Sequence, residues 1–142
     1  MRVAFASDDE NETTRAVLGA LIDAGHLVLR PEGPESWPDL GRFVGRAVVE
    51  GRADYGVVMC WTGTGTAIAA NKVPGVRAAL AWDPWVARGA RLWNDANVLA
   101  MSLKRLAPDV AVEVLQAFLT TTTPDPDEAA NIAELDRSAG SD

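Results

Sequence analysis

The sequence predicts one doubly wound α/β domain with a five-stranded parallel sheet and helices on both faces. Two observations carry this prediction. Five short apolar runs recur along the chain, and stretches with helical spacing and recognisable helix ends separate them. With 142 residues, 48% of them hydrophobic, the chain has enough apolar material for one core. Strands that alternate with helices pair in parallel through right-handed crossovers.

The apolar runs are the predicted strands. They are RVAFAS (2–7), HLVL (26–29), YGVVMC (55–60), RAALA (77–81) and NVLAM (97–101). We expect the strand order 2-1-3-4-5, in which the connections reverse direction between the first and third strands. Ligands of open α/β sheets bind beyond the carboxyl ends of the strands at such a reversal.

The first two predicted helices are read from their ends and their spacing. Residues 12–24 follow Asp8–Asn11, which supplies capping side chains, and stop before Gly25, a residue suited to the position after a helix. Residues 39–50 place apolar side chains three and four residues apart, at Leu40, Phe43, Val44, Ala47 and Val48.

Proline marks the starts of the next two helices. DPWVARGARLW begins with Asp83 and Pro84, the preferred pair of a cap and a first helical residue. APDVAVEVLQAFL begins in the same way with Pro108 and Asp109.

The C-terminal segment has a different composition, with a threonine run and two prolines before one acidic amphipathic helix. We expect this helix at about residues 125–136, with Ile132 and Leu135 on one face. It either tucks against its own chain or reaches onto a second subunit, and the sequence leaves both open. The expected organisation is a single domain over residues 1–136 and a frayed tail over residues 137–142.

Composition excludes several classes of function. The net charge of −7 argues against nucleic acid and against polybasic membrane attachment, because no basic stripe is present. No apolar run approaches the ~20 residues of a membrane span, and the acidic start is unlike a secretory signal. One cysteine makes no internal disulfide. We expect a cytoplasmic protein.

Polar residues follow the first and third predicted strands. The first strand ends in SDDEN and the third in MCWTGTG. Because the predicted crevice lies between these strands, Asp8, Asp9, Cys60 and Thr62 should surround it. Asp8 has an alternative role as a cap of the first helix, and His26, in a short strand, is expected to be structural.

The loop around Gly63, Thr64 and Gly65 leads into a helix whose free N–H groups and positive dipole end favour an anion. It is not a Walker A loop, because Lys72 lies a helix away, and Ile68 does not fit a dinucleotide fingerprint. A cysteine at such a position has a lowered pKa. The alternative is that Cys60 is a small buried hydrophobe, as most free cysteines are.

Residues 55–101 resemble the type B ribose-5-phosphate isomerase family, which includes galactose- and allose-phosphate isomerases. The shared pattern is Cys60, Thr62, Gly63, Gly65, Ala69, Ala70, Asn71, Lys72, Gly75, Arg77, Ala78, Asp83, Pro84, Asn94, Asp95, Asn97, Val98 and Leu99. Ser7-Asp8 and Trp37-Pro38-Asp39 are similar to further landmarks of the family, and the likeness extends to about Asp136.

The resemblance implies a three-layer Rossmann-like (flavodoxin-like) subunit and a homodimer whose sites are shared between chains, with a dimer of dimers as the alternative assembly. It implies interconversion of aldose and ketose phosphates through an enediolate, without a metal or an organic cofactor. Cys60 matches the base of one branch of the family. Thr62 and the loop amides would stabilise the oxyanion, Asp8 would move the hydroxyl proton, and Asn94 would position substrate from the other chain.

The sequence departs from the family where the family binds phosphate and opens the sugar ring. Asp9 and Trp93 replace histidines, and Trp61 replaces a glycine. The family's phosphate-binding arginine pair aligns with Asp127 and Asn131, and Lys104 alone keeps a basic family position. Alternatively, Arg137, Arg88 or Arg91 could replace the lost cations.

These changes predict an isomerase of an unphosphorylated or unusual sugar-like substrate, because they remove cations and add carboxylates. The expected catalytic residues are Cys60, Thr62 and Asp8. The expected substrate-binding residues are Asp9, Trp61, Gly63, Thr64, Gly65, Trp93, Asn94, Lys104 and Asn131. Tryptophan faces suit sugar C–H surfaces, which favours a site-lining role for Trp61 and Trp93. The alternative is that the tryptophans fill the core and a dimer interface, and it applies above all to Trp82 and then to Trp37 and Trp85. The alternatives are a catalytically impaired binding or assembly protein and an ordinary ribose-5-phosphate isomerase.

Overall fold

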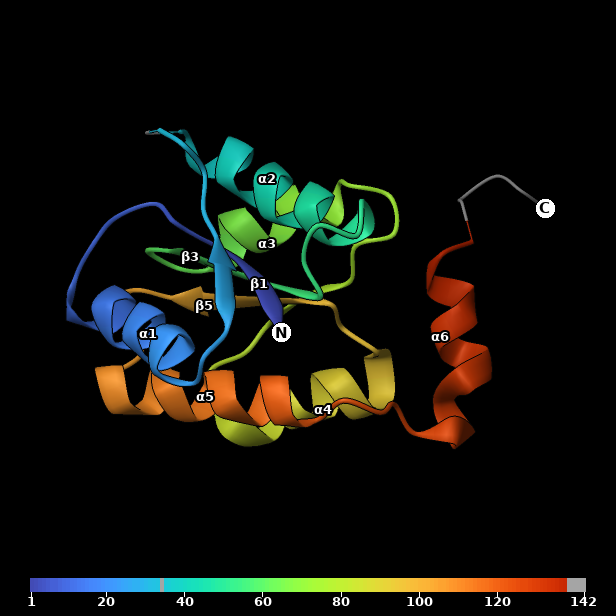
Figure 1. Cartoon of the computed structure of the whole chain (residues 1–142). Coiled ribbons are helices and arrows are strands. Elements are labelled where there is room, and N and C mark those ends of the chain that lie inside the picture. The colour runs from blue at the N-terminus through green and yellow to red at the C-terminus, as the bar shows by residue number, and fades with distance from the viewer. Residues whose placement is uncertain (34, 138–142) are drawn as a thin grey trace.

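The computed structural model describes residues 1–33 and 35–137 as a parallel sheet with helices on both faces (Figure 1). The strands are β1 (Arg2–Ser7), β2 (Leu27–Leu29), β3 (Tyr55–Cys60), β4 (Ala78–Leu80) and β5 (Val98–Ser102). The helices are α1 (Glu12–Asp23), α2 (Trp37–Val49), α3 (Thr64–Asn71), α4 (Pro84–Asn94), α5 (Pro108–Thr120) and α6 (Ala129–Leu135). The predicted fold class is confirmed.

The strand order is β2-β1-β3-β5-β4, so the prediction of 2-1-3-4-5 was wrong for the last two strands. The connection from β3 to β4 skips one position, and β5 then fills it. β5 is fully buried over its five residues, whereas β4 has three residues that are only half-buried. The longer apolar strand, β5, therefore takes the interior position between β3 and β4, where both faces and both edges are covered, and β4 takes the sheet edge. The reversal between β1 and β3 is unchanged.

The helices form two layers with separate cores. Helices α2 and α3 cover one face of the sheet, and α1, α4 and α5 cover the other (Figure 1). The α2 and α3 backbones approach closely at Gly41, where an added Cβ would lie 2.6 Å from Cβ of Ala69. Glycine at this position lets α3 sit tightly under α2.

Local signals explain where α1 and α4 begin. The side chain of Asn11 accepts a hydrogen bond from the Thr14 N–H at 3.0 Å and caps α1. Asp83 does the same for α4 through the Val86 N–H at 2.8 Å. Asp8 is therefore not the cap of α1. Helix α2 begins at Trp37, two residues before its predicted start at 39.

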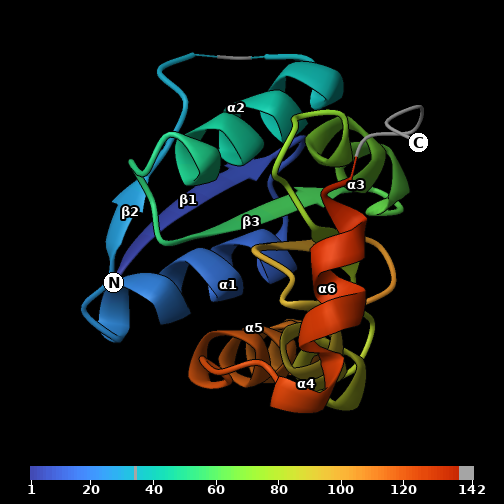
Figure 2. The same cartoon turned by 90° about the vertical axis from the view of Figure 1, so that its right-hand side faces the viewer.

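The C-terminal helix α6 stands beside the body of the domain rather than in either layer (Figures 1 and 2). A short 3₁₀ turn, Pro126–Glu128, precedes it, so a helical segment exists close to the predicted residues 125–136. No α6 residue is buried, and Leu135 is 58% exposed. Of the predicted frayed tail, residues 138–142 lie outside the described residues. Over residues 1–33 and 35–137, every helix is too short or too polar to span a bilayer.

Candidate active site at the carboxyl end of the sheet

A cavity of about 290 Å³ opens where β1 and β3 end, at the predicted reversal. We call this place, where the carboxyl termini of the parallel strands meet, the carboxyl end of the sheet. The residues that line the cavity are Asp8, Trp37, Cys60, Trp61, Thr62, Thr64 and Gly65. The structure thus brings the predicted catalytic trio of Asp8, Cys60 and Thr62 together.

The loop between β3 and α3 owes its shape to Gly63. This residue has φ of +78°, a left-handed conformation that side chains disfavour. An added Cβ would also lie 2.6 Å from Cδ1 of Leu80 and 2.9 Å from the carbonyl carbon of Met101. Glycine therefore lets the chain turn sharply and start α3 directly beside the end of β3.

Cys60 is buried, with 6% of its surface exposed, and its thiol lies at the cavity. The Thr66 hydroxyl donates a hydrogen bond to Sγ at 3.3 Å. Burial alone would raise the pKa of the thiol. Hydrogen bonds from the Thr66 hydroxyl and from the backbone N–H groups of Thr66, Gly63 and Thr62 outweigh burial and lower the Cys60 pKa below its usual value. The loop is thus built to favour a thiolate.

The other loop groups are arranged around the sulfur. Thr62 and Thr64 share a hydrogen bond between their Oγ1 atoms at 2.7 Å, and Thr62 Oγ1 also accepts from the Thr64 N–H at 3.3 Å. Within residues 1–33 and 35–137, no hydrogen bond uses the Gly65 N–H, and Gly65 lines the cavity. Asp8 is fixed by its backbone N–H, which donates to the Met59 carbonyl at 2.9 Å.

Two tryptophans give the cavity apolar walls. Trp61 was predicted there, but Trp37 was not. The Trp37 ring lies over Gly65, with its Cε3 atom 3.0 Å from the position that a Cβ would take. All five tryptophans are at least 41% exposed, so none of them fills the core of this chain, whereas a place in a dimer interface, with Trp82 as the strongest candidate, stays a prediction.

The described lining residues of the cavity include no Lys, Arg or His side chain, and Asp8 is the one carboxylate among them. Lys104 is exposed just beyond β5 and donates its backbone N–H to the Trp61 carbonyl at 3.3 Å. Asp9 lines a neighbouring cleft with Glu10 and Arg30. Among the described residues, no group of three or more His, Cys, Asp or Glu side chains is placed to hold a metal ion.

Three further predicted residues lie elsewhere in the chain. Asn94 lines a different cavity with Arg77 and Leu135, at the opposite, amino end of the sheet. Trp93 packs edge-on against Trp85, with ring centroids 5.7 Å apart. Asn131 is on α6, where it donates to Glu128 Oε2 at 2.9 Å. The structure therefore does not bring Trp93, Asn94 or Asn131 to the Cys60 cavity of the same chain.

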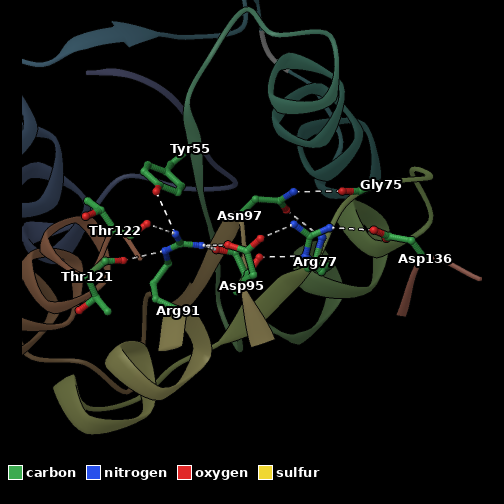
Figure 3. Close-up of polar contacts among 10 residues, drawn as sticks. Tyr55, Gly75, Arg77, Arg91, Asp95, Asn97, Thr121, Thr122 and Asp136 are labelled. Atoms are coloured by element: carbon green, nitrogen blue, oxygen red, sulfur yellow. Dashed lines mark hydrogen bonds and ion pairs between the residues drawn. The ribbon is translucent and has the colours of Figure 1, made fainter. Parts of the chain in front are cut away.

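The amino end is held by a buried arginine, Arg91, which is 2% exposed (Figure 3). Its guanidinium donates to Asp95 Oδ1 at 2.8 Å, to the Tyr55 hydroxyl at 3.0 Å and to the backbone carbonyls of Thr121, Thr122 and Ala96. These bonds use the whole donor set of the side chain. Arg91 is consequently not a replacement for the missing phosphate-binding cations.

A second arginine extends this network. Arg77 donates to Asp95 Oδ2 at 3.1 Å and to Asp136 Oδ2, just beyond α6, at 3.2 Å (Figure 3). Asp95 has φ of +46°, the one non-glycine residue in the left-handed region among the described residues. Carboxylate bonds to two guanidiniums hold it in that conformation.

Comparison with known proteins identifies the family. The ribose/galactose isomerase family model matches residues 3–135. The Bacillus subtilis protein YwlF, named as a candidate sugar phosphate isomerase, is 37% identical over 127 residues, which span 85% of each chain. A 4-deoxy-4-sulfo-D-erythrose isomerase of Clostridium sp. is 32% identical over 129 residues, 85% of this chain and 80% of that protein.

Solved structures of the family also have the same fold as this chain. The structure of Clostridium thermocellum ribose-5-phosphate isomerase B superposes with a TM-score of 0.88 at 33% identity, covering 96% of this chain and 95% of that chain. The relatives are named as sugar isomerases with different substrates, which agrees with the predicted class of enzyme. The chain is a sugar isomerase and belongs to the ribose/galactose isomerase family.

Proposed function

We propose that this isomerase interconverts an aldose and a ketose with Cys60 as the base, on a sugar-like substrate that lacks a terminal phosphate. The observation that carries the proposal is the Cys60 thiol, held by donors from Thr66 and the loop at a cavity with tryptophan walls and, among its described lining residues, no cation. The lowered pKa favours the thiolate, which is the form of the side chain that accepts a proton.

The chemistry follows from the placement of the groups. The Cys60 thiolate takes the proton from C2 of the open-chain aldose, and the C–H electron pair forms an enediolate. The Gly65 N–H and the Thr62 hydroxyl face the cavity and are suited to stabilise the developing oxyanion. Asp8 moves the proton between the two hydroxyl oxygens. The Cys60 thiol then returns its proton to C1, which completes the ketose and restores the thiolate.

Charge argues against phosphate. Phosphate contacts are charge-assisted and need cations. The cavity offers Asp8 instead, and the next cleft holds Asp9 together with Arg30, whose guanidinium lies 3.8 Å from Glu10 Oε1. The segment that would carry the family's arginine pair is acidic, and its Arg137 pairs with Glu134 at 3.0 Å. One relative is named for a sulfonated erythrose, which shows that the family's substrates vary in their anionic group.

The proposal includes a cytoplasmic homodimer. The resemblance to the family implies that Asn94 positions substrate in the site of the other chain. Its position at the amino end of the sheet, away from the Cys60 cavity of its own chain, agrees with this arrangement. Trp93, the preceding residue, would then bring an indole to the place where the family has its ring-opening histidine.

Exchange of the C2 proton tests the proposal directly. The purified protein is incubated in D2O with unphosphorylated aldoses and ketoses of four to six carbons, with sugar acids and with ribose 5-phosphate. We expect deuterium at C2 of an unphosphorylated sugar, and a loss of about 10²–10⁴-fold in Cys60→Ala, the usual contribution of acid–base catalysis.

The other outcomes separate the alternatives. Exchange with ribose 5-phosphate alone would overturn the substrate assignment and leave the cysteine mechanism. Exchange that is unchanged in Cys60→Ala would overturn the mechanism. No exchange with any sugar would favour a binding protein. Trp61→Gly, which restores the family's glycine without changing charge, serves as the control for cavity shape.

A further inference from the structure

Thr66 is the buried hydroxyl nearest the sulfur of Cys60. It is the third residue of α3 and is 0% exposed. Its Oγ1 atom lies 3.3 Å from Cys60 Sγ and 3.4 Å from the Gly63 carbonyl oxygen. A hydroxyl carries one proton, so it donates to one of these two acceptors at a time.

The two acceptors correspond to the two protonation states of the thiol. Beside a thiolate, the hydroxyl gains more by donating to the charged sulfur than to a neutral carbonyl. Beside a thiol, Thr66 can turn its proton to Gly63, the backbone bond that threonine forms readily within a helix. Its oxygen then accepts the S–H. Both states are satisfied without any heavy atom moving.

We propose that Thr66 is a positioning residue that sets the protonation of Cys60 through this two-way hydrogen bond. A simple structural role would need only the Gly63 carbonyl, which already satisfies the buried hydroxyl. The second acceptor makes Thr66 part of the proton balance of the thiol. It stabilises the thiolate before proton abstraction and accepts the S–H of the thiol afterwards. Cys60 can therefore both take up the proton and return it.

Few other charges compete for control of this thiol. Asp8, from the end of β1, is the one charged side chain among the described lining residues, and it is not among the groups that shift the Cys60 pKa. Lys104, beyond β5, contacts Trp61 through its backbone N–H, and its side chain is not part of the described cavity lining. The contributions to the cavity from α2 and α3 are Trp37, Thr64 and Gly65, none of which titrates. Hydrogen bonds from the loop and from Thr66 therefore have to offset burial.

The test measures the thiol directly. Cys60 is the single cysteine of the chain, so iodoacetamide alkylation reports it without background. The alkylation rate of the full chain is measured against pH for the natural protein, Thr66→Val and Thr66→Ser. Valine keeps the shape and removes the hydroxyl, whereas serine keeps the hydroxyl.

We expect the natural midpoint below about 8.5, the value of an unperturbed thiol. Thr66→Val should raise the midpoint by about one pH unit, which is about a tenfold lower alkylation rate well below the midpoint. Thr66→Ser should stay near the natural value. Circular dichroism checks folding, and Thr66→Ala repeats the test if the valine variant does not fold.

An unchanged midpoint in Thr66→Val would overturn the proposal, as would an equal shift in Thr66→Ser. The catalytic part of the proposal rests on the function proposed above, but the alkylation midpoint needs no substrate. A shifted midpoint without C2 exchange would therefore support the role of Thr66 while rejecting the isomerase mechanism. Cys60-dependent exchange with an unchanged midpoint would reject Thr66 alone.

Discussion

At the amino end of the sheet, the guanidinium of Arg91 is buried and all of its donors are bonded to the protein. At the carboxyl end, the Cys60 thiol and the Asp8 carboxylate face an open cavity instead. Both ends use a residue in the left-handed region, Asp95 at one end and Gly63 at the other. Both ends therefore contain a residue with positive φ, but their polar groups differ in what they contact.

This difference separates stability from chemistry. Buried polar groups that are fully bonded hold elements in place and are costly to break. Polar groups that face a cavity are free to bind a ligand or exchange a proton. Changes at the amino end should thus lower the free energy of unfolding and leave the thiol unaltered, whereas changes at the cavity should mainly alter the thiol.

The largest effect on stability is expected for Arg91→Met. Removing the guanidinium leaves the carbonyls of Thr121 and Thr122 without this donor and leaves Asp95 paired with Arg77 alone. We expect the free energy of unfolding to fall by roughly 3–5 kcal/mol, as for other broken buried ion pairs, with no shift in the alkylation midpoint of Cys60. Urea unfolding measures the first quantity.

Arg88→Met is the matched control, because Arg88 is on the same helix and exposed. It should change stability by no more than about 0.5 kcal/mol. A loss of similar size in both variants would break the contrast between the ends, since it would show that the cost comes from helix α4 as a whole.

Gly63→Ala should have the next largest effect and act on both quantities. The left-handed conformation costs alanine about 1–2 kcal/mol, and the close Leu80 and Met101 atoms add overpacking of about 1–3 kcal/mol. Because the loop turns at Gly63, its N–H donors should leave the sulfur and the alkylation midpoint should rise. Urea unfolding and alkylation together measure the variant.

Gly19→Ala should change the free energy of unfolding in the opposite direction. Gly19 is inside α1, and no atom lies within 4 Å of its added Cβ. Alanine there should stabilise the protein by about 0.5–1 kcal/mol. If Gly63→Ala is equally harmless, the loop tolerates side chains and its geometry does not position the thiol.

The smallest effect is expected for Asp136→Asn. Its carboxylate is 53% exposed and pairs with Arg77 at 3.2 Å. Exposed ion pairs contribute about 0–1 kcal/mol, and Arg77 keeps its bond to Asp95. We expect the free energy of unfolding, measured with urea, to fall by no more than about 0.5 kcal/mol. A larger loss would show that α6 contributes to the stability of the amino end.

Strand positions were predictable, but the sheet order was only partly so. The apolar runs 2–7 and 55–60 coincide with β1 and β3, because each has a buried interior, with Asp8 directly after the first run and Asp54 directly before the second. The exchanged positions of β4 and β5 depend on which strand is buried on both edges. Two runs of similar length in the sequence do not carry that information.

The cavity was largely predictable because residues that follow β1 and β3 meet at one end of a parallel sheet. Trp37 was missed although a signal existed. A helix that follows a strand begins at the carboxyl end, and Pro38 marks the start of α2 there. The direction of the Thr66 hydroxyl depends on side-chain packing, and no spacing rule gives it.

The contacts of α4 also determine where the C-terminal segment leaves the body. Arg91 binds the carbonyls of Thr121 and Thr122, and the Leu92 carbonyl accepts from the Asp125 N–H at 2.7 Å. Residues of α4 therefore determine where the C-terminal segment leaves the body of the domain. Beyond Asp125, the sequence can change its charge through substitutions such as those at Asp127 and Asn131 while its point of departure stays fixed. The body and its tail can thus diverge at different rates.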